Sequence, residues 1–278
     1  LLIGQGRIDK PEGSSKGFSR LFGESFLRDI DFKFAHRSKS IWQDLESETG
    51  EKLLHLSGGL DIVSGTDARK DIKKVISAIR RRKGEFDFLD AAALRSRYPQ
   101  FRPCSNTYSV FSPDSGILKS DRCMSAAILA GKKHKLTIRE KTRVMGIENF
   151  HSGTILVKTS SCKSYRTKKL ILAVGPWAPN LLGQFGIRLP LQVSQEQVVY
   201  FSPRFNQNLF TPENFPVWEW EGKDFVYGFP IFEENGIKVA FHKDGRYLKN
   251  LREFRKMPSK EVIDRLGMFL NRHIPDAA

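Results

Sequence analysis

The chain has 278 residues, of which 40% are hydrophobic, and a formal net charge of +15 at pH 7. This composition is typical of a globular protein with a sizeable core, in two domains or one large one. The sequence has no run of about 18 apolar residues that would span a membrane, and its first residues lack the layout of a signal peptide. We therefore expect a soluble, intracellular protein without a membrane partner.

The three cysteines, Cys104, Cys123 and Cys162, are scattered along the chain. They form neither a C-x-x-C pair nor a cluster with histidines, so the sequence supports neither a disulfide framework nor a zinc site. Reduced thiols and no bound metal are the simpler expectation.

The excess positive charge raises the question of an anionic partner. It gathers in short runs such as Arg80–Lys83. Cations also favour the last turn of a helix, and Gly84 follows this run, so solvated helix ends explain the charge equally well. Because no zinc finger, aromatic RNA-binding signature or basic zipper is present, we expect no specific nucleic-acid partner.

The first quarter of the chain predicts a strand, a loop, a helix and a strand pair. Residues 1–5 resemble a short buried strand. The Gly/Ser-rich loop 12–20 suits a close approach to phosphate, although such loops are also common connectors. Apolar residues at helical spacing predict a long helix over 26–49, broken at most once and ended by Gly50, and a strand pair follows over 53–64.

The middle of the chain alternates between helices and strands. A turn at 113–116 separates two extended runs within 108–118. Helices are expected over 71–83, 90–97 and 123–129, the last capped by Ser120 or Asp121.

Between residues 136 and 175 the apolar period changes to two, which predicts an antiparallel meander with turns at 151–153 and 160–164. The run 170–174 differs because it is continuously apolar, as in a parallel strand that is covered on both faces. It leads through a glycine-containing turn into a helix over 180–185. This arrangement is how α/β folds approach nucleotide cofactors.

A second strand system runs from residue 190 to a hairpin over 226–242, and a helix over 259–272 ends the pattern. The pair Asn235-Gly236 tolerates positive φ and predicts the hairpin turn. The alternation of β-rich and α/β blocks predicts a mixed α/β fold with two interleaved domains.

The hairpin offers two faces because side chains alternate along a strand. Ile237, Val239 and Phe241 form the apolar face. Lys238 and His242 share the other face, with Tyr227 from the first strand, and the small Ala240 leaves space between them. This polar face is either the solvated side of a sheet or the floor of a site.

Seven segments in order resemble the FAD-dependent amine oxidases typified by monomeric sarcosine oxidase and the peroxisomal sarcosine and pipecolate oxidases. They span almost the whole chain, and the ordered set is specific although each piece is weak. The segments are 13–20, 41–50, 57–60, 113–116, 170–177, 189–191 and 227–242.

The resemblance implies an FAD-binding, Rossmann-like domain interleaved with a catalytic domain rich in β-sheet. The FAD-binding domain would comprise 1–56 and 119–190, and the catalytic domain 57–118 and 191–278. Enzymes of this family oxidise the C–N bond of a secondary amine, such as an N-methyl amino acid, to an imine. Dioxygen then reoxidises the flavin and yields hydrogen peroxide.

The resemblance also implies roles for individual residues. Lys238 is similar to the lysine that activates oxygen, Tyr227 and His242 to substrate-pocket residues, and Arg20 to an arginine beside the flavin. A fixed ammonium would stabilise the negative charge that develops as oxygen is reduced. Further cofactor contacts are expected at Ser14, Ser15, Lys16, Gly17, Val144, Gly175 and Trp177.

The chain departs from the family pattern in the cofactor domain. It lacks the G-x-G-x-x-G turn, Gly4 stands where an acidic residue is expected, and Gly23 replaces a second arginine. The family's flavin-linking cysteine would follow Ala278. We therefore expect a chain that is incomplete at both ends and binds flavin weakly or not at all.

Two other functions remain open at this point. A non-catalytic remnant could persist as a basic interaction protein, and a flavin dehydrogenase could pass electrons to another acceptor. We expect a monomer in the cytoplasm. A full-length eukaryotic form that carries a C-terminal peroxisomal signal would instead be expected in peroxisomes. Residues 276–278 are not such a signal.

Overall fold

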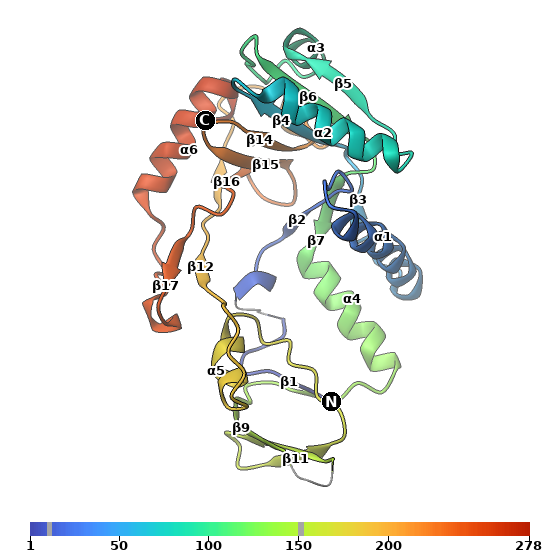
Figure 1. The fold of residues 1–278 in the computed structure, drawn as a ribbon, viewed down its shortest axis with the longest axis vertical. Helices are drawn as coiled ribbons and strands as arrows, with labels where there is room; N and C mark the ends of the chain where they lie inside the picture. Colours follow the sequence, from blue (N-terminus) through green and yellow to red (C-terminus); the bar gives the residue numbers. More distant parts are fainter. Residues whose placement is uncertain (10–12, 150–152) are drawn as a thin grey trace.

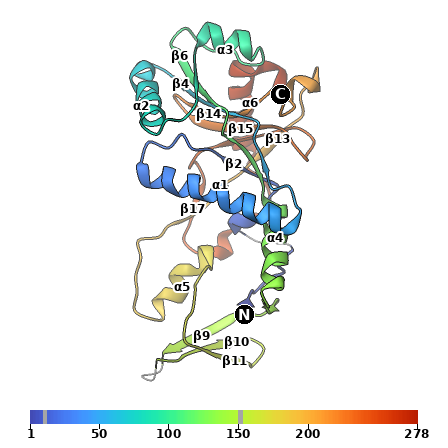
Figure 2. The ribbon, with the colours of Figure 1, turned by 90° about the vertical axis from the view of Figure 1, so that its right-hand side faces the viewer.

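The computed structural model describes residues 1–9, 13–149 and 153–278. In Figure 1 they form a broad upper part with one large sheet and a thinner lower part that carries the N-terminus. Figure 2 shows the same two parts one above the other after a quarter turn. The fold is mixed α/β, as the sequence predicts. Residue 12 of the predicted loop and residues 151–152 of the predicted turn lie outside the described residues.

The upper part is built on a seven-stranded mixed sheet. Strands β4 and β14 pair in parallel, and the other neighbours pair antiparallel. In spatial order the strands are β13 (Val199–Phe201), β16 (Ile237–Phe241), β15 (Phe225–Ile231), β14 (Val217–Glu221), β4 (Gly59–Ser64), β6 (Thr107–Ser112) and β5 (Asp87–Asp90).

One face of this sheet buries the main hydrophobic core against α3 (Ala91–Arg97) and α6 (Lys260–His273). Trp218, Leu94 and Leu266 are 0% exposed there. Burial of such large side chains is the main stabilising contribution to the fold.

The opposite face is covered by α2 (Ala68–Arg81) and by a second, three-stranded sheet. Ile72 of α2 packs near Val63, whereas Ile117 of the second sheet packs on Phe229. The large sheet is therefore covered on both sides. The second sheet consists of β2 (Ser19–Phe22), β7 (Gly116–Lys119) and β3 (Leu54–His55).

The helix expected over 26–49 is one unbroken helix, α1 (Asp29–Thr49). Gly50 ends it with a φ of 76°, and its N–H donates to the backbone oxygen of Glu46 at 2.8 Å. No residue of α1 is buried, although Trp42 packs against the small core beside α4 (Ser120–Lys133). Among the described residues, no helix is long and apolar enough to cross a membrane.

The remaining helix predictions are confirmed within a few residues by α2, α3, α4, α5 (Ala178–Gly183) and α6. Asp90 caps α3 by accepting from the N–H of Ala93 at 2.9 Å. The cap expected for α4 is wrong, because Ser120 is already helical and Lys119 precedes it without a side-chain cap.

The strand pair expected over 53–64 is also wrong. Both strands exist, but β3 pairs with β7 and β4 pairs with β14 and β6, so they belong to different sheets. Gly58 between them has a φ of 76°. This left-handed backbone turns the chain from one sheet to the other.

The antiparallel meander predicted within 136–175 is present, but its first and last strands are not the predicted ones. The run expected to open it supplies β8 (Ile138–Arg139), which pairs in parallel with β1 (Leu2–Ile3). Leu2 is 43% exposed, so the strand predicted at the N-terminus is not buried. The meander consists of β9 (Val144–Asn149), β10 (Ile155–Thr159) and β11 (Ser164–Thr167).

The apolar run 170–174 does not form the predicted buried strand. Ile171 is 90% exposed. A strand of this kind needs neighbours on both edges and layers on both faces. Among the described residues, β1 and β8 form a sheet of only two strands and no strand pairs with 170–174. The short elements that complete the fold are η1 (Gly13–Ser15), η2 (Gly175–Trp177), β12 (Val193–Gln195), η3 (Gln207–Phe210), β17 (Arg246–Leu248), η4 (Leu251–Glu253) and η5 (Pro275–Ala277).

The hairpin prediction is confirmed by β15 and β16. Positive φ occurs at Glu233 (57°) and Gly236 (116°), whereas Asn235, the other residue predicted to tolerate it, is not left-handed. A Cβ at Gly236 would lie 2.6 Å from the backbone oxygen of Phe201, so glycine is required there. The predicted apolar face of β16 packs in the main core.

The polar face of β16 is not solvated. Lys238 is 6% exposed and Ala240 only 1%, because the second sheet covers them. The interpretation as a wet sheet face is therefore wrong, and the space expected above Ala240 is closed to solvent.

Candidate active site

Lys238 is a buried ammonium on the covered face of the large sheet. Its Nζ donates to the backbone oxygen of Ser19 at 2.9 Å and to the Oγ of the same serine at 3.2 Å. Nζ also lies 4.4 Å from the centroid of the Phe229 ring, within the range of a cation–π contact. Among the described residues, no carboxylate forms an ion pair with it.

Burial is the main reason why the pKa of Lys238 falls from 10.5 to about 8, and the positive charge of Arg20 lowers it further. At pH 7 the side chain therefore remains charged. A buried cation without a counter-ion is costly, so its presence indicates a function for its charge.

Arg20 links Lys238 to the Gly/Ser-rich loop. Its guanidinium donates to the backbone oxygens of Ser14, of Lys16 at 2.7 Å and of Ser19 at 2.8 Å. Gly17, with a φ of 112°, lets the loop fold around it, since a Cβ there would lie 3.3 Å from Nη1. Arg20 thus orders the loop and adds positive charge beside Lys238.

Tyr227 lies on the same face as Lys238. It is the cross-strand partner of Ala240, and its ring meets that of Phe229 edge to face with centroids 6.2 Å apart. Desolvation raises the pKa of its phenol, and Arg20 partly opposes this effect. Tyr227 therefore offers a protonated hydroxyl at neutral pH.

His242 lies just beyond the end of β16 and is exposed. Its ring packs on that of Phe225, with centroids 4.5 Å apart. Partial desolvation and then the charge of Lys243 lower its pKa, so the imidazole is neutral at pH 7. The structure thus places His242 at the rim of the face that carries Lys238 and Tyr227.

The predicted cofactor residues fall into two groups. Segments η1 and η2 lie together, since a Cβ at Gly13 would lie 3.8 Å from Cδ of Pro176. This contact brings Ser14 and Ser15 near Gly175 and Trp177. Val144 begins β9, a strand that Figure 1 shows at the end of the molecule opposite the large sheet.

Sequence reasoning missed three polar residues on the covered face. Ser19 holds Lys238, and Asp61 and Glu219 are partners on the parallel strands β4 and β14. Desolvation raises the pKa of Asp61 to about 6 and that of Glu219 to about 7. The only sequence signal is an acidic residue flanked by apolar residues in each strand, which does not reveal that the two strands pair.

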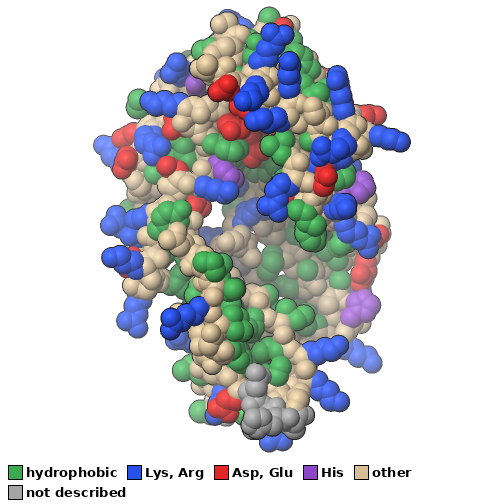
Figure 3. Space-filling view, viewed as in Figure 1, with side chains coloured by type: hydrophobic (Ala, Val, Ile, Leu, Met, Phe, Trp, Pro, Cys, Tyr) green, Lys and Arg blue, Asp and Glu red, His purple; other side chains and the backbone are tan. Residues whose placement is uncertain are grey.

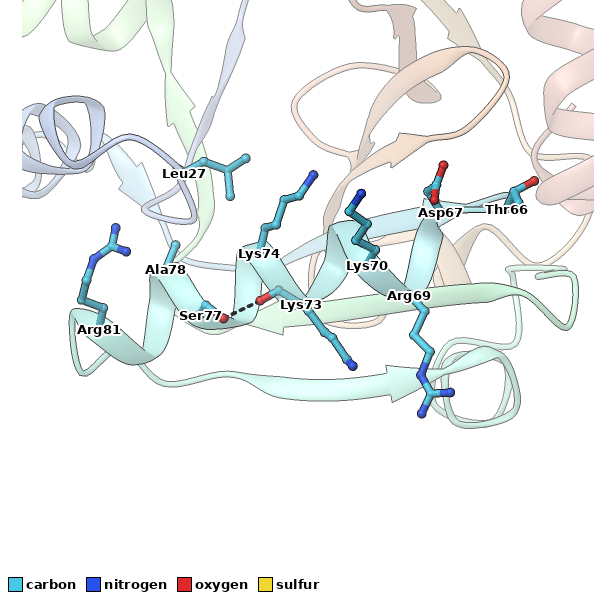
Figure 4. A pocket seen from close by; sticks show the side chains of 10 residues that line it. All are labelled: Leu27, Thr66, Asp67, Arg69, Lys70, Lys73, Lys74, Ser77, Ala78 and Arg81. Atoms are coloured by element: carbon cyan, nitrogen blue, oxygen red, sulfur yellow. Dashed lines mark hydrogen bonds between the residues drawn. The ribbon is translucent and has the colours of Figure 1, made fainter.

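A groove of about 770 Å³ runs along the outer side of α2, and none of the candidate residues lines it. In Figure 4, Lys70 and Lys74 point to the side of Leu27, whereas Arg69 and Lys73 point away from it. This groove is separate from the face that carries Lys238. Figure 3 shows a hollow between the upper and lower parts of the molecule, with hydrophobic side chains around it.

The sequence matches the family model of FAD-dependent oxidoreductases (DAO) over residues 2–278. The chain belongs to this family. Peroxisomal sarcosine oxidase of Homo sapiens is 26% identical over 283 residues, which cover 99% of this chain and 70% of the relative. Monomeric sarcosine oxidase of Streptomyces avermitilis is 27% identical over 241 residues, which cover 84% of this chain and 60% of the relative. The chain thus spans 60% to 70% of the length of these two relatives.

Solved structures of oxidases share the fold. The open form of NikD, an amino acid oxidase essential for nikkomycin biosynthesis, aligns with a TM-score of 0.83 at 19% identity and covers 99% of this chain and 71% of its own. Glycine oxidase from Geobacillus kaustophilus aligns with a TM-score of 0.79 at 16% identity over the same shares.

The family is FAD-dependent, and the loop residues fit the anionic part of this cofactor. Ser14, Ser15 and Lys16 are exposed, and within the described residues their side chains have no partners. A Cβ at Gly175 would meet nothing within 4 Å, so the backbone there is open to a ligand. Hydroxyls, an ammonium and open backbone suit a diphosphate.

Proposed function

We propose that this protein is an FAD-dependent oxidase of a secondary amine or an N-methyl amino acid. Two electrons and two protons leave the C–N unit to give an imine, and dioxygen takes them up as hydrogen peroxide. The observation that carries the proposal is the buried ammonium of Lys238, which no described acidic side chain neutralises. The similarity to sarcosine oxidases supports the substrate class.

Lys238 acts as a fixed positive charge. Ser19 holds it from one side and the Phe229 ring from another, so little reorganisation is needed when negative charge develops nearby. Such preorganised charges in a dry site contribute more than they would in water.

Tyr227 and His242 provide hydrogen-bonding groups for the substrate. The phenol of Tyr227 can donate or accept, and its raised pKa keeps it protonated. The neutral imidazole of His242 can accept a hydrogen bond from the substrate amine at the rim of the site. Arg20 adds a cation that suits a substrate carboxylate.

Ser14, Ser15 and Lys16 would hold the FAD diphosphate, with Gly175 and Trp177 beside them. Bound FAD supplies the electron acceptor for the amine and the site at which dioxygen is reduced. We further propose that the protein is an intracellular monomer. We also propose that it is divided into the two interleaved domains expected from the sequence, with 1–56 and 119–190 in one and 57–118 and 191–278 in the other.

The direct experiment is to saturate the protein with FAD and measure peroxide and oxygen uptake with a panel of N-methyl amino acids. Peroxide formed in a 1:1 ratio with oxygen consumed supports an oxidase. Turnover that requires an added dye or quinone and consumes no oxygen would instead show a dehydrogenase. Absence of turnover in an FAD-saturated protein contradicts the proposal.

A further inference from the structure

The groove along α2 is lined mainly by positive charge. One of its lining residues, Asp67, is acidic, whereas five are cations. The cations are Arg69, Lys70, Lys73, Lys74 and Arg81. The segment 67–83 has eight lysines and arginines against two aspartates, which gives it a net charge of +6 in a chain whose total is +15. Much of the excess charge of the protein therefore lies at this groove.

The stability of α2 does not account for these cations. Positive side chains favour the last turn of a helix, but Arg69 and Lys70 stand in the first turn of α2, where the helix dipole disfavours them. Each is also followed four residues later by another cation, Lys73 or Lys74, and like charges at this spacing destabilise a helix. The solvated helix ends considered from the sequence therefore explain the charge at the end of α2 but not that at its start.

Most cations in the first half of α2 are unpaired. Lys74 forms an ion pair with Asp71 at 2.6 Å. Within the described residues, the side chains of Arg69, Lys70 and Lys73 have no ion-pair or hydrogen-bond partner. All four cations are exposed. They are therefore free to meet an anionic ligand without breaking contacts that hold the fold.

The groove also has an apolar contact point at Leu27, which lines it and is 54% exposed. The buried side chain of Arg82 holds this segment, because its guanidinium donates to the backbone oxygen of Leu27 at 3.3 Å and to Asp29 at 2.9 Å. In Figure 4, Lys70 and Lys74 point to the side of Leu27. Positive and apolar side chains thus share one side of the groove.

The spacing of the charges suits an extended peptide. Lys70 and Lys74 are about one helical turn apart, which is about 6 Å along the axis. In an extended peptide, alternate side chains lie on one face about 6.6 Å apart, so carboxylates at alternate positions can reach both lysines. A single-stranded nucleic acid gains affinity from stacking on aromatic side chains, and none of the described lining residues is aromatic. An anionic lipid surface is too broad to enter the groove.

We propose that the groove along α2 docks an extended acidic segment of another protein. The segment has carboxylates at alternate positions and an apolar residue that contacts Leu27. From Lys70 to Arg81 the helix rises by about 16 Å, which is the length of about five extended residues. The site does not depend on the proposed function, because none of the candidate catalytic or cofactor residues lines the groove.

Two fluorescein-labelled peptides that differ only in charge test this proposal. One alternates glutamate with serine over about eight residues, enough to span the groove, and ends in leucine. The other has glutamine in place of each glutamate. Fluorescence anisotropy with the full chain at about 150 mM salt measures both affinities. We expect the glutamate peptide to bind at least about tenfold more tightly than the glutamine peptide, and to weaken as salt is raised.

The double variant Lys70→Gln/Lys74→Gln should weaken binding of the glutamate peptide at least about fivefold. The matched control Lys168→Gln/Lys169→Gln removes the same charge from exposed positions outside the groove. It should change the affinity by less than about twofold. All four lysines are exposed, so both variants are expected to fold.

The outcomes decide both the site and the class of ligand. A preference for the glutamate peptide that the groove variant loses and the control variant keeps supports the proposal. Equal affinity for the two peptides, or no binding of either up to about 1 mM, overturns it. Equal losses in the two double variants would show general electrostatic attraction and also overturn it.

Two further probes address other anionic ligands, namely a single-stranded oligonucleotide with the same charge as the glutamate peptide and vesicles that contain phosphatidylserine. Weaker binding of both than of the glutamate peptide supports an acidic protein segment. If either binds more tightly and loses affinity in the groove variant, the groove belongs to that class of ligand and the proposal is overturned.

Discussion

The large sheet and the cofactor region differ in how firmly their residues are held. By cofactor region we mean η1, η2, 170–174 and the β1–β8 pair. The large sheet is covered on both faces, and Lys238 within it is 6% exposed. In the cofactor region Ile171 is 90% exposed, and Ser14 and Lys16 are open to solvent. The face that carries Lys238 is therefore held by packing and by hydrogen bonds such as those from Lys238 to Ser19, whereas the groups that would bind FAD lie on exposed loops.

The difference predicts a large contrast in stability. Trp218→Ala removes a fully buried ring from the main core and should lower the free energy of unfolding by about 3–5 kcal/mol. Ile171→Ala, at a side chain that is 90% exposed in the cofactor region, should change it by less than about 0.5 kcal/mol. Denaturant unfolding followed by circular dichroism measures both. Equal losses would show that the two regions unfold as one equally packed body.

The neighbouring acids Asp61 and Glu219 predict that the stability of the protein depends on pH. The folded-state pKa of Glu219 is about 7, above its ordinary value of 4.5, so folding favours the protonated form. The free energy of unfolding should therefore fall as pH rises from about 4.5 through about 7.

Glu219→Gln should remove part of this fall and stabilise the protein at pH 8 by about 1–2 kcal/mol, allowing for partial exposure of the group. Unfolding midpoints at pH 4.5 and pH 8 check the difference. Glu221→Gln should affect it much less, and an unchanged slope in Glu219→Gln would refute the raised pKa.

Substitutions in the cofactor region are expected to have smaller effects than those in the large sheet, and these effects appear as changes in FAD affinity. We expect weak FAD binding, with a Kd above about 1 μM. Lys16→Ala should weaken it about fivefold and flatten its salt dependence, because an exposed charge contributes about 1 kcal/mol or less. Quenching of FAD fluorescence during titration measures the Kd. Lys70→Ala on α2 is the matched control, and equal effects of the two substitutions would remove Lys16 from the cofactor site.

Local patterns allowed much of the fold to be predicted from the sequence. Helical spacing located α1 and α6, and alternation located the hairpin and both of its faces. The failures concern tertiary context. An apolar run such as 170–174 does not reveal whether partner strands exist, and neighbouring strands such as β3 and β4 can enter different sheets.

The same limit applies to the candidate site. Lys238 was found because a family resemblance gave it a role, whereas residue type alone favoured the surface. Asp61 and Glu219 were not found, because their proximity depends on a parallel pairing between segments far apart in the chain. Such a pairing leaves no local pattern in either strand.

The role of Lys238 is tested most directly by stopped-flow kinetics of Lys238→Met in the FAD-saturated protein. Methionine keeps much of the side-chain length but removes the charge. We expect flavin reoxidation by dioxygen to slow by about a hundredfold or more, and flavin reduction by the amine to slow by less than about tenfold. Lys223→Met, at an exposed lysine, should leave both rates unchanged. Equal slowing of the two half-reactions in Lys238→Met would contradict the assignment of Lys238 to oxygen activation.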